Sequence, residues 1–227
     1  MNTNDRLVSS AKIFMKESIL PKYSYNFTWL GRTILQYPQD IIAMQEIIWN
    51  IKPDLIIETG IACGGSLIFW ASMLELIGED AHVLGIDINI LDHNRAEIEK
   101  HPMYKWITMI DGSSIDSGVV SKVYDFAKDK KKVLVCLDSR HTHDHVLKEL
   151  ELYSPLVTRG SYLIVFDTII EDLPDELFPN RPWGTKNNPK TAVWEFLKSN
   201  TRFEIDKQIE NKLLITVAPD GYLECVK

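Results

Sequence analysis

Short apolar runs alternate with amphipathic stretches along most of the chain, from about residue 54 onward. Five of these runs are rich in aliphatic residues and show little polar alternation, which is typical of strands covered on both faces. Strands that alternate with helices predict right-handed βαβ units and a doubly wound, mostly parallel sheet. We therefore expect an α/β fold with strands at 54–58, 82–87, 106–110, 133–137 and 161–166 and helices at 66–77, 94–100, 117–128, 141–153 and 191–199.

The first 50 residues precede this alternation. They read as helical, and Asp40 is a predicted N-cap for a helix at 41–51. A group of aromatic residues just upstream predicts a hydrophobic cover for one face of the sheet; it also suits the wall of a substrate pocket or the surface of a homo-oligomer. We expect one globular domain, with 1–50 as a cover segment and 51–227 as the ligand-binding part. The aromatic residues are Tyr23, Tyr25, Phe27 and Trp29.

The end of the chain departs from the βα alternation. Apolar runs at 203–206 and 212–218 follow one another without a helix, and the turn Pro219-Asp220-Gly221 leads into a third run at 222–226. Consecutive strands joined by turns are typical of antiparallel pairing. We therefore expect an antiparallel hairpin at one edge of the sheet.

A proline-rich segment at residues 171–190 follows the fifth predicted strand and has no periodicity. Structureless loops of this length are usually lids, binding loops or disordered. The segment leaves the carboxyl edge of the sheet, where open α/β folds bind ligands. We expect it to act as a lid.

Composition narrows the class of protein. The chain has 227 residues, of which 45% are hydrophobic and 25% charged, and its net charge of −7 argues against a nucleic-acid partner, which requires a basic surface. No apolar run reaches the about 18 residues of a membrane span, and the polar start contains no apolar signal core. We expect a cytoplasmic protein in which Cys63, Cys136 and Cys225, which lack CxxC spacing, are buried reduced thiols.

The first candidate site is the sequence Glu58-Thr-Gly60-Ile-Ala-Cys-Gly64-Gly65-Ser66, between the first predicted strand and its helix. Glycines let the backbone turn tightly and approach a ligand, and the helix start offers free N–H groups. A dinucleotide site would read GxGxxG, and Glu58 at the strand end would repel its pyrophosphate. The acid suits the amino group of a methionine tail instead, which favours S-adenosylmethionine. We call residues 60–66 the glycine turn.

Polar residues also end the next two strands. Asp87 ends the second strand, where a carboxylate can accept hydrogen bonds from both ribose hydroxyls. The third strand leads into Asp111 and Ser113, which can line an adenine pocket, although Asp111 also suits a turn or a helix cap. Because the ends of parallel strands meet at one edge, these residues are expected beside the glycine turn.

The fourth and fifth strands end in Asp138 and Asp167. Two converging carboxylates can hold a hard divalent cation, which would lower the pKa of a bound substrate hydroxyl. His141, His145 and Glu149 follow at a spacing that places them on one face of the predicted helix. A third ligand with clear spacing for zinc is missing, so His141 is predicted as a base or substrate contact and His145 as a packed histidine.

Several stretches together resemble the cephalosporin hydroxylase/rhamnosyl O-methyltransferase family, over roughly residues 25 to 218. They are Thr28-Trp29-Leu30-Gly31, Tyr37-Pro38-Gln39-Asp40, Gln45-Glu46-Ile47-Ile48, Lys52-Pro53-Asp54-Leu55-Ile56-Ile57-Glu58-Thr59-Gly60, Gly64-Gly65-Ser66, Asp138-Ser139-Arg140-His141, His145-Val146 and Glu149-Leu150. The resemblance implies a Rossmann-like class I methyltransferase fold that binds S-adenosylmethionine and usually a magnesium ion.

The resemblance also implies roles for individual residues. It implies Asp138 and Asp167 as the metal-binding carboxylates. The family tends to place two adjacent acids after the fifth strand, where this chain has Phe166 before Asp167, so the sequence leaves open whether the metal site is complete. The positions matching those that bind the cofactor are Glu58, Gly60, Gly64, Gly65, Ser66, Asp87, Asp111 and Ser113.

The resulting expectation is an S-adenosylmethionine-dependent O-methyltransferase. Its acceptor is a hydroxyl on a sugar, a glycan or a small secondary metabolite, with Asp138, Asp167 and His141 acting on that hydroxyl. Within the methyltransferases, a hydroxylated β-lactam is an alternative acceptor. Outside the methyltransferases, two classes of protein stay open. One is a nicotinamide-linked oxidoreductase, which Glu58 and the glycine spacing disfavour, and the second is a non-catalytic cofactor-binding subunit.

Overall fold

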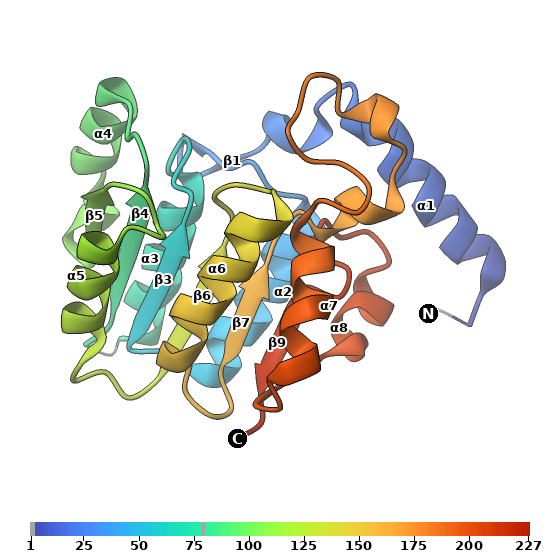
Figure 1. Cartoon of the computed structure of the whole chain (residues 1–227). Coiled ribbons are helices and arrows are strands. Elements are labelled where there is room, and N and C mark those ends of the chain that lie inside the picture. The colour runs from blue at the N-terminus through green and yellow to red at the C-terminus, as the bar shows by residue number, and fades with distance from the viewer. Residues whose placement is uncertain (1–2, 79) are drawn as a thin grey trace.

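The computed structural model describes residues 3–78 and 80–227, and a seven-stranded sheet forms its centre (Figure 1). The strand order is β5-β4-β3-β6-β7-β9-β8. The first five strands of this order are parallel, and β9 runs antiparallel to both of its neighbours. The strands are β3 Leu55–Thr59, β4 His82–Asp87, β5 Ile107–Asp111, β6 Val133–Leu137, β7 Tyr162–Val165, β8 Phe203–Ile205 and β9 Tyr222–Cys225.

The predicted α/β fold is confirmed, and the five predicted parallel strands are found within one or two residues of their expected bounds. Strand β3 lies in the middle of the order, and its last residue, Thr59, pairs with Ile86 of β4 and Leu137 of β6. Asp87 pairs in turn with Asp111 of β5. The register therefore brings the carboxyl ends of the central strands to one edge, and the loops that follow them lie side by side.

Helices cover both faces of the sheet, which explains why its strands are apolar throughout. Helices α2 (Pro38–Ile51) and α3 (Gly65–Ile77) share one buried cluster with Ile56 and Cys136 of the sheet. On the other face, α5 (Ser117–Ala127), α6 (His143–Tyr153) and α7 (Pro189–Ser199) share a second cluster with strand residues such as Ile57. In Figure 1 the second group lies in front of the sheet and the first behind it.

The N-terminal segment folds against the first of these faces. Helix α1 (Asp5–Ile19) extends away from the body, and a short 3-10 helix at Tyr23–Asn26 leads into the two-residue strands β1 (Thr28–Trp29) and β2 (Arg32–Thr33) (Figure 1). Among the aromatic residues, Tyr23, Phe27 and Trp29 pack against the core, as a cover requires, whereas Tyr25 is about half exposed and lines a cavity.

The prediction that Asp40 caps α2 is wrong. The helix begins at Pro38, and Tyr37 is its N-cap residue, because proline is pre-organised for the first helical position and supplies no N–H that would need a cap. Asp40 lies in the first turn and is fully buried. Its carboxylate accepts hydrogen bonds from Thr216, Val217 and Tyr222 near the other end of the chain.

The C-terminal prediction is correct in its pairing and wrong in one element. Strands β8 and β9 pair antiparallel, as expected. The run 212–218 is not a strand, because a short helix, α8 (Lys207–Leu213), connects them. Asp206 caps this helix by accepting a hydrogen bond from the Gln208 N–H, and Ile209 and Leu213 pack against the core. Ile209 and Leu213 thus form an apolar face of α8, whereas residues 214–218 lie outside any helix or strand and are held by Asp40 through Thr216 and Val217.

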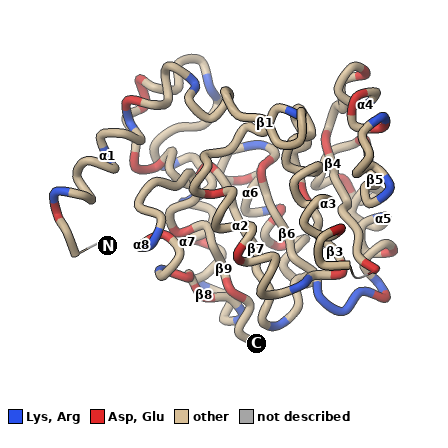
Figure 2. The backbone as a smooth tube through the Cα atoms, turned by 180° about the vertical axis from the view of Figure 1, so that it is seen from behind, with Lys and Arg blue, Asp and Glu red and all other residues tan. Residues whose placement is uncertain are grey.

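Acidic and basic positions are interspersed along the backbone (Figure 2). No helix in the described parts of the chain is both long and apolar enough to cross a bilayer. Cys136 and Cys225 are buried free thiols as expected, but Cys63 is only half-buried because it lies in the glycine turn at the edge of the cavity.

The remaining chain elements complete the connections. Helix α4 (Asp92–Glu99) and the 3-10 helix Pro102–Trp106 join β4 to β5, and the 3-10 helix Ser154–Leu156 precedes β7. The proline-rich segment, residues 171–190, is ordered by two 3-10 helices, Thr168–Asp172 and Asp175–Leu177, and by a bridge between Gly184 and Asn187. It lies beside the turn that follows α1 (Figure 1).

Candidate active site

A cavity of about 570 Å³ opens at the carboxyl edge of the sheet, within the size range of small-molecule sites. Its inner wall is the glycine turn together with Asp87, Asp138 and Asp167. Its outer wall comes from residues 18–37 of the N-terminal segment and from the proline-rich segment. The cavity therefore joins three parts of the chain that are far apart in sequence.

The glycine turn is fixed by close contacts with backbone atoms. A Cβ on Gly60 would lie 2.1 Å from the Asp138 carbonyl oxygen, and one on Gly65 would lie 2.1 Å from the Thr33 carbonyl oxygen. Gly60 also has a φ of +92°, which favours glycine. The turn is thus pressed against the end of β6 on one side and against β2 on the other, and only glycine fits at these two positions.

Two side chains hold the turn from outside, and no local pattern in the sequence marks either of them. The Arg32 guanidinium donates to the Cys63 carbonyl oxygen, with Nε at 3.2 Å, and to Asn94 Oδ1. Asn94 donates in turn to the Ala62 carbonyl oxygen at 3.0 Å. Ala62 has a φ of +46°, an unusual conformation for a residue with a side chain. We infer that Arg32 and Asn94 stabilise this strained conformation.

Glu58 lies beneath the turn and does not line the cavity. It is fully buried, and Ser66 donates a hydrogen bond of 2.9 Å to its Oε2. Burial raises the pKa of Glu58 to about 8, although the Ser66 hydroxyl opposes the shift. Ser66 itself lines the cavity. The Glu58 carboxyl group therefore does not reach the cavity itself. It is hydrogen-bonded to Ser66, which does line the cavity.

Asp87 lines the cavity and is tied to the glycine turn. Its Oδ2 accepts hydrogen bonds from the N–H groups of Ile61 at 2.8 Å and Ala62 at 3.3 Å. Its Oδ1 accepts from the Asn89 N–H at 3.0 Å. A carboxylate fixed by backbone donors is pre-organised, and its remaining lone pairs can accept from a ligand.

Asp111 and Ser113 stand apart from the other predicted cofactor residues. Asp111 forms an ion pair with Arg95 and accepts a hydrogen bond from the Ile90 N–H at 3.0 Å. Neither Asp111 nor Ser113 lines the cavity. The next residue, Ser114, is buried and contacts His145 at 3.2 Å. Asp111 and Ser114 at the end of β5 therefore bond to other groups of the protein and do not line the cavity.

The carboxylates that end β6 and β7 meet at the cavity wall. One ligand atom each from Asp138, His141 and Asp167 lies within 4.8 Å of the others, and His141 Nε2 is 3.2 Å from Asp167 Oδ2. Burial, and then the negative charge of Asp167, raise the pKa of Asp138 well above its usual range. Like charges held this close favour a cation or a proton between them. Two carboxylates and an imidazole form a donor set that fits a divalent cation.

Asp167 has a φ of +56°, and the surrounding structure keeps it in this conformation. Thr168 Oγ1 donates 2.6 Å to the Pro219 carbonyl oxygen, and the Ile169 N–H donates 3.1 Å to the Val217 carbonyl oxygen. Val217 is in turn held by Asp40. Non-glycine residues in this region cost stability and persist at functional sites when their neighbours fix them.

Gln36 is a cavity residue that the sequence analysis missed. Its Nε2 lies 3.4 Å from Asp138 Oδ2, and only 5% of the residue is exposed. Because the amide nitrogen faces a carboxylate, the amide oxygen must point the other way, and this Oε1 is buried without a hydrogen-bond partner in the described structure. The unpaired oxygen can accept a hydrogen bond from a ligand. No periodic pattern marks residue 36, which comes from a connection between β2 and α2.

The expected helix face of His141, His145 and Glu149 is partly wrong. Helix α6 begins at His143, so His141 lies before it and turns toward Asp167. His145 and Glu149 do lie on one face, 3.6 Å apart. Ser139 donates 2.7 Å to the fully buried Glu149 carboxylate, and His145 contacts the same hydroxyl at 3.2 Å. This polar network supports the chain directly after Asp138, and His145 is packed, as predicted.

The proline-rich segment reaches the acids through one aromatic side chain. The Trp183 ring lies edge-on to the His141 ring, with 4.8 Å between ring centres. The Arg181 guanidinium lies 5.1 Å from the centre of the Trp183 ring. Arg181, Trp183 and His141 all line the cavity. The segment thus covers the cavity in this structure, in the position that a lid requires.

Known proteins resemble this chain over most of its length. The model of the family described as Rhamnosyl O-methyltransferase/CmcI matches residues 21–226. The rhamnosyl O-methyltransferase of Mycobacterium leprae is 30% identical over 197 residues, which cover 86% of this chain and 82% of that protein. The rhamnosyl O-methyltransferase of Mycobacterium tuberculosis is 28% identical over 197 residues, which cover 86% of this chain and 77% of that protein.

Solved structures agree with this fold. CmcI with SAH matches at a TM-score of 0.63 and 20% identity, covering 88% of this chain and 83% of that chain. CmcI with Mg-SAM matches at a TM-score of 0.60 and 19% identity, covering 89% and 78%. The Rossmann-like class I methyltransferase fold is confirmed, and the chain belongs to the rhamnosyl O-methyltransferase/CmcI family as an S-adenosylmethionine-dependent O-methyltransferase.

Proposed function

We propose that the enzyme methylates a hydroxyl group of a sugar or glycan, with Asp138, His141 and Asp167 acting on that hydroxyl. The observation that carries the proposal is the convergence of these three side chains on the cavity wall, next to the glycine turn. The rhamnosyl O-methyltransferases of mycobacteria support a sugar as the acceptor. A small hydroxylated metabolite, including a hydroxylated β-lactam, is the second acceptor class, because the matching family also includes CmcI.

The cofactor is proposed to lie along the glycine turn. Asp87, pinned by the N–H groups of Ile61 and Ala62, would accept hydrogen bonds from the ribose hydroxyls. Ser66 and Gln36 line the same space and would contact the methionine tail. Glu58 then acts through Ser66, which it orients by a hydrogen bond of 2.9 Å. Asp111 would have to release Arg95 and the Ile90 N–H before it could contact adenine, and Ser113 lies outside the cavity as well.

Asp138 and Asp167 would hold a divalent cation, with magnesium the expected ion, and such a cation supplies Lewis acidity that lowers the pKa of a bound hydroxyl. Phe166 stands where a further acid was expected, but Asp138 and Asp167 already meet without it. His141 would accept the hydroxyl proton on Nδ1, because its Nε2 faces Asp167 Oδ2 at 3.2 Å and carries the hydrogen of that contact; in this role His141 is not a ligand of the cation.

The transfer itself is an in-line displacement. The acceptor oxygen forms a bond to the methyl carbon while the bond from that carbon to sulfur breaks, which leaves S-adenosylhomocysteine. Because the sulfonium already activates the methyl group, orientation of the two reactants accounts for much of the catalysis. The close fit of Gly60 against Asp138 fixes the distance between the cofactor turn and the acids.

The proposal is tested by separating cofactor binding from methyl transfer. Calorimetry with S-adenosylmethionine compares the wild type with Asp87→Ala, Asp167→Asn and the control Asp125→Asn, whose side chain is exposed on α5 outside the cavity. We expect Asp87→Ala to weaken cofactor binding by about tenfold or more, because hydrogen bonds to charged groups contribute about 1.5–3 kcal/mol. Asp167→Asn should bind the cofactor within about threefold of the wild type and lose about 100-fold or more in methyl transfer.

Methyl transfer is measured against a panel of neutral sugars, sugar phosphates, uronic acids and phenols, with magnesium and with EDTA. Methyl transfer to sugars whose rate decreases in EDTA supports both a sugar acceptor and a role for a divalent cation. Transfer to phenols alone would overturn the sugar proposal, and transfer that is unaffected by both EDTA and Asp167→Asn would remove the acids from the reaction.

A further inference from the structure

Two cations line the outer wall of the cavity, and they come from segments far apart in the sequence. Lys22 lies in the turn between α1 and the 3-10 helix Tyr23–Asn26, and Arg181 lies in the proline-rich segment. Neither forms an ion pair within residues 3–78 and 80–227. The chain has a net charge of −7, so these cations are not part of a generally basic surface.

Arg181 brings to the cavity wall a guanidinium group, which can bind an anion. Its guanidinium lies over the Trp183 ring, 5.1 Å from the ring centre. A guanidinium packed on an aromatic face keeps its N–H donors in its own plane, at the edge of the contact, where a carboxylate or phosphate can bind two of them. The backbone at this point is also fixed, because the Arg181 N–H donates to the Phe178 carbonyl oxygen at 3.2 Å.

Lys22 is held in a similar way. Its Nζ lies over the Tyr25 ring, 5.5 Å from the ring centre. Its N–H donates to the Ile19 carbonyl oxygen at 2.9 Å and its carbonyl oxygen accepts from the Tyr25 N–H at 3.0 Å, while its φ of +54° marks a tight turn. Both cations are therefore presented on aromatic rings that themselves face the cavity, since Tyr25 and Trp183 line it.

The inner wall has the opposite charge. Asp87, Asp138 and Asp167 lie there, and a negatively charged group of an acceptor would be repelled from them unless a bound cation offset their charge. A contact chain joins the two walls, because Arg181 lies on Trp183, Trp183 on His141, and His141 on Asp167. The cavity thus has an acidic end, where a hydroxyl is activated, and a cationic end with aromatic rings.

We propose that the acceptor is an anionic sugar, which presents its reacting hydroxyl to Asp138 and Asp167 and its phosphate or carboxylate group to Lys22 and Arg181. The inference rests on the proposed function and narrows its substrate class.

The experiment measures binding of matched probes to the enzyme loaded with S-adenosylhomocysteine. The probes are methyl α-rhamnoside as the neutral sugar, rhamnose 1-phosphate, and glucuronic acid as the carboxylate. We expect at least one anionic probe to bind about tenfold or more tightly than the neutral sugar, as charge-assisted hydrogen bonds would give. The double variant Lys22→Gln/Arg181→Gln should reduce the ratio of anionic to neutral affinity to about one. In the wild type, the anionic probe that binds more tightly shows whether the site prefers a phosphate or a carboxylate.

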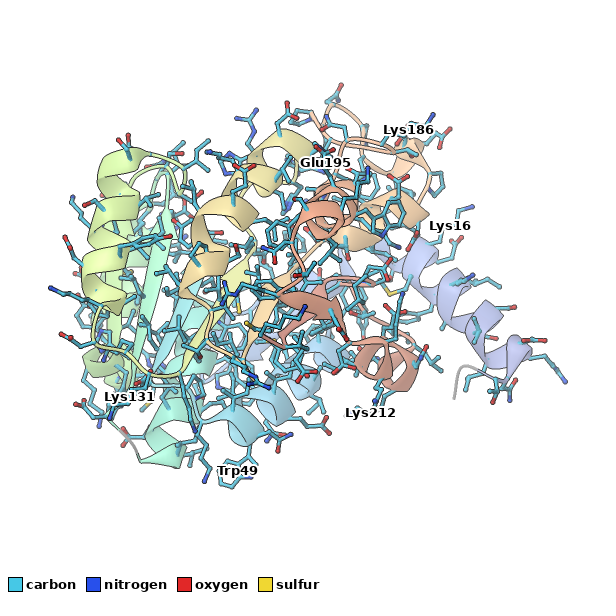
Figure 3. The ribbon with its side chains drawn as sticks, turned by 60° about the horizontal axis from the view of Figure 1, so that its bottom comes forward. Lys16, Trp49, Lys131, Lys186, Glu195 and Lys212 are labelled. Atoms are coloured by element: carbon cyan, nitrogen blue, oxygen red, sulfur yellow. The ribbon has the colours of Figure 1, made fainter. Side chains whose placement is uncertain are left out.

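The control is the double variant Lys16→Gln/Arg159→Gln, which removes the same charge from exposed positions outside the cavity; Lys16 lies on the projecting helix α1 (Figure 3). It should leave the ratio unchanged. Equal binding of neutral and anionic probes, or a preference that survives the Lys22 and Arg181 changes, overturns the inference. If the preference for anionic probes disappears in EDTA, the anion binds instead to a cation held by Asp138 and Asp167. That outcome also overturns the inference.

Methyl transfer to the same probes distinguishes this failure from failure of the proposed function. If the neutral sugar is methylated as well as the charged ones, the anion inference fails and the sugar methyltransferase proposal stands. If none of the sugars binds or is methylated while phenols are, the proposed function fails, and the anionic-sugar inference fails with it.

Discussion

The glycine turn and the proline-rich segment line the same cavity but are built in different ways. At the glycine turn, backbone meets backbone: Gly60 lies against the Asp138 carbonyl group and Gly65 against that of Thr33, with no room for a methyl group. In the proline-rich segment, the cavity is lined by long side chains, Arg181 and Trp183, that contact each other and His141.

This difference separates the two tasks of the enzyme. Backbone contacts fix positions to a fraction of an ångström and allow few substitutions, which suits a cofactor that is the same in every turnover. Contacts between side chains can be exchanged one at a time without moving the sheet, which suits recognition of a particular acceptor. We therefore expect changes at the turn to affect cofactor binding and folding, and changes in the outer wall to affect the choice of acceptor.

The largest effect should come from Gly65→Ala. The added methyl group would meet the Thr33 carbonyl oxygen at 2.1 Å and the Ile34 Cα at 2.6 Å, so β2 or the start of α3 must move. Overpacking of this kind costs about 1–3 kcal/mol of stability. A displacement of about 1 Å at a reacting site can lower activity about 100-fold. Urea unfolding measures the loss of stability, methyl transfer measures the loss of activity, and calorimetry with S-adenosylmethionine shows whether cofactor affinity falls as well.

Gly118→Ala is the matched control, because Gly118 also lies in the first turn of a helix, α5. Its added Cβ would meet only Asp116 Oδ1, at 3.2 Å, and alanine has the higher helix propensity. We expect unchanged cofactor binding and equal or slightly higher stability. Wild-type cofactor affinity in Gly65→Ala would show that the contact between the turn and β2 does not position the cofactor.

A second test concerns Asp40, which holds Val217 and, through Val217, the chain that follows Asp167. Asp40 is buried, and burial raises its pKa to about 6 from the usual 3.8. Because the folded-state pKa is the higher one, the stability that Asp40 contributes is full below about pH 3.8 and is lost as the pH rises through about 6. Between about pH 4.5 and pH 7 this loss amounts to about 2 kcal/mol.

Asp40→Asn removes the titration, so the two proteins are compared by urea unfolding across this pH range. Other carboxylates contribute equally to both and cancel in the difference. We expect the stability of the wild type relative to the variant to fall by about 2 kcal/mol from pH 4.5 to pH 7. A difference that is constant with pH would mean that Asp40 titrates normally despite its burial.

The sequence was sufficient to predict strands, whose signal is local, and to predict which strand ends meet, because the parallel topology alone determines that. Apolar runs located the parallel strands, and parallel pairing then required that the ends of β3, β4, β6 and β7 share one edge. This reasoning brought Asp138 and Asp167 together, and the structure confirms that they meet. The same reasoning could not show that Glu58 points beneath the turn, because the face of a strand end depends on packing against α3.

What the sequence could not show involves contacts between distant segments. Gln36 reaches Asp138 across 102 positions and Arg32 reaches Cys63 across 31, and neither lies in a periodic pattern. Asp40 looked like a helix cap because acids are common there, yet its partners Thr216 and Tyr222 lie near the other end of the chain. Such residues are found only when the fold has placed both segments.

The smallest effect, and the sharpest test at the glycine turn, is expected for Glu58→Gln. Because burial raises the pKa of Glu58 to about 8, the carboxyl group is mostly protonated at pH 7, and an amide of the same shape keeps an oxygen for the Ser66 hydroxyl. We expect calorimetry at pH 7 to show S-adenosylmethionine affinity within about threefold of the wild type, whereas Glu58→Ala, which leaves Ser66 without its acceptor, should lose about tenfold. If both variants weaken binding equally, the charged carboxylate itself contacts the methionine amino group. The glycine turn would then bind the cofactor through an ion pair with Glu58 in addition to its close backbone contacts.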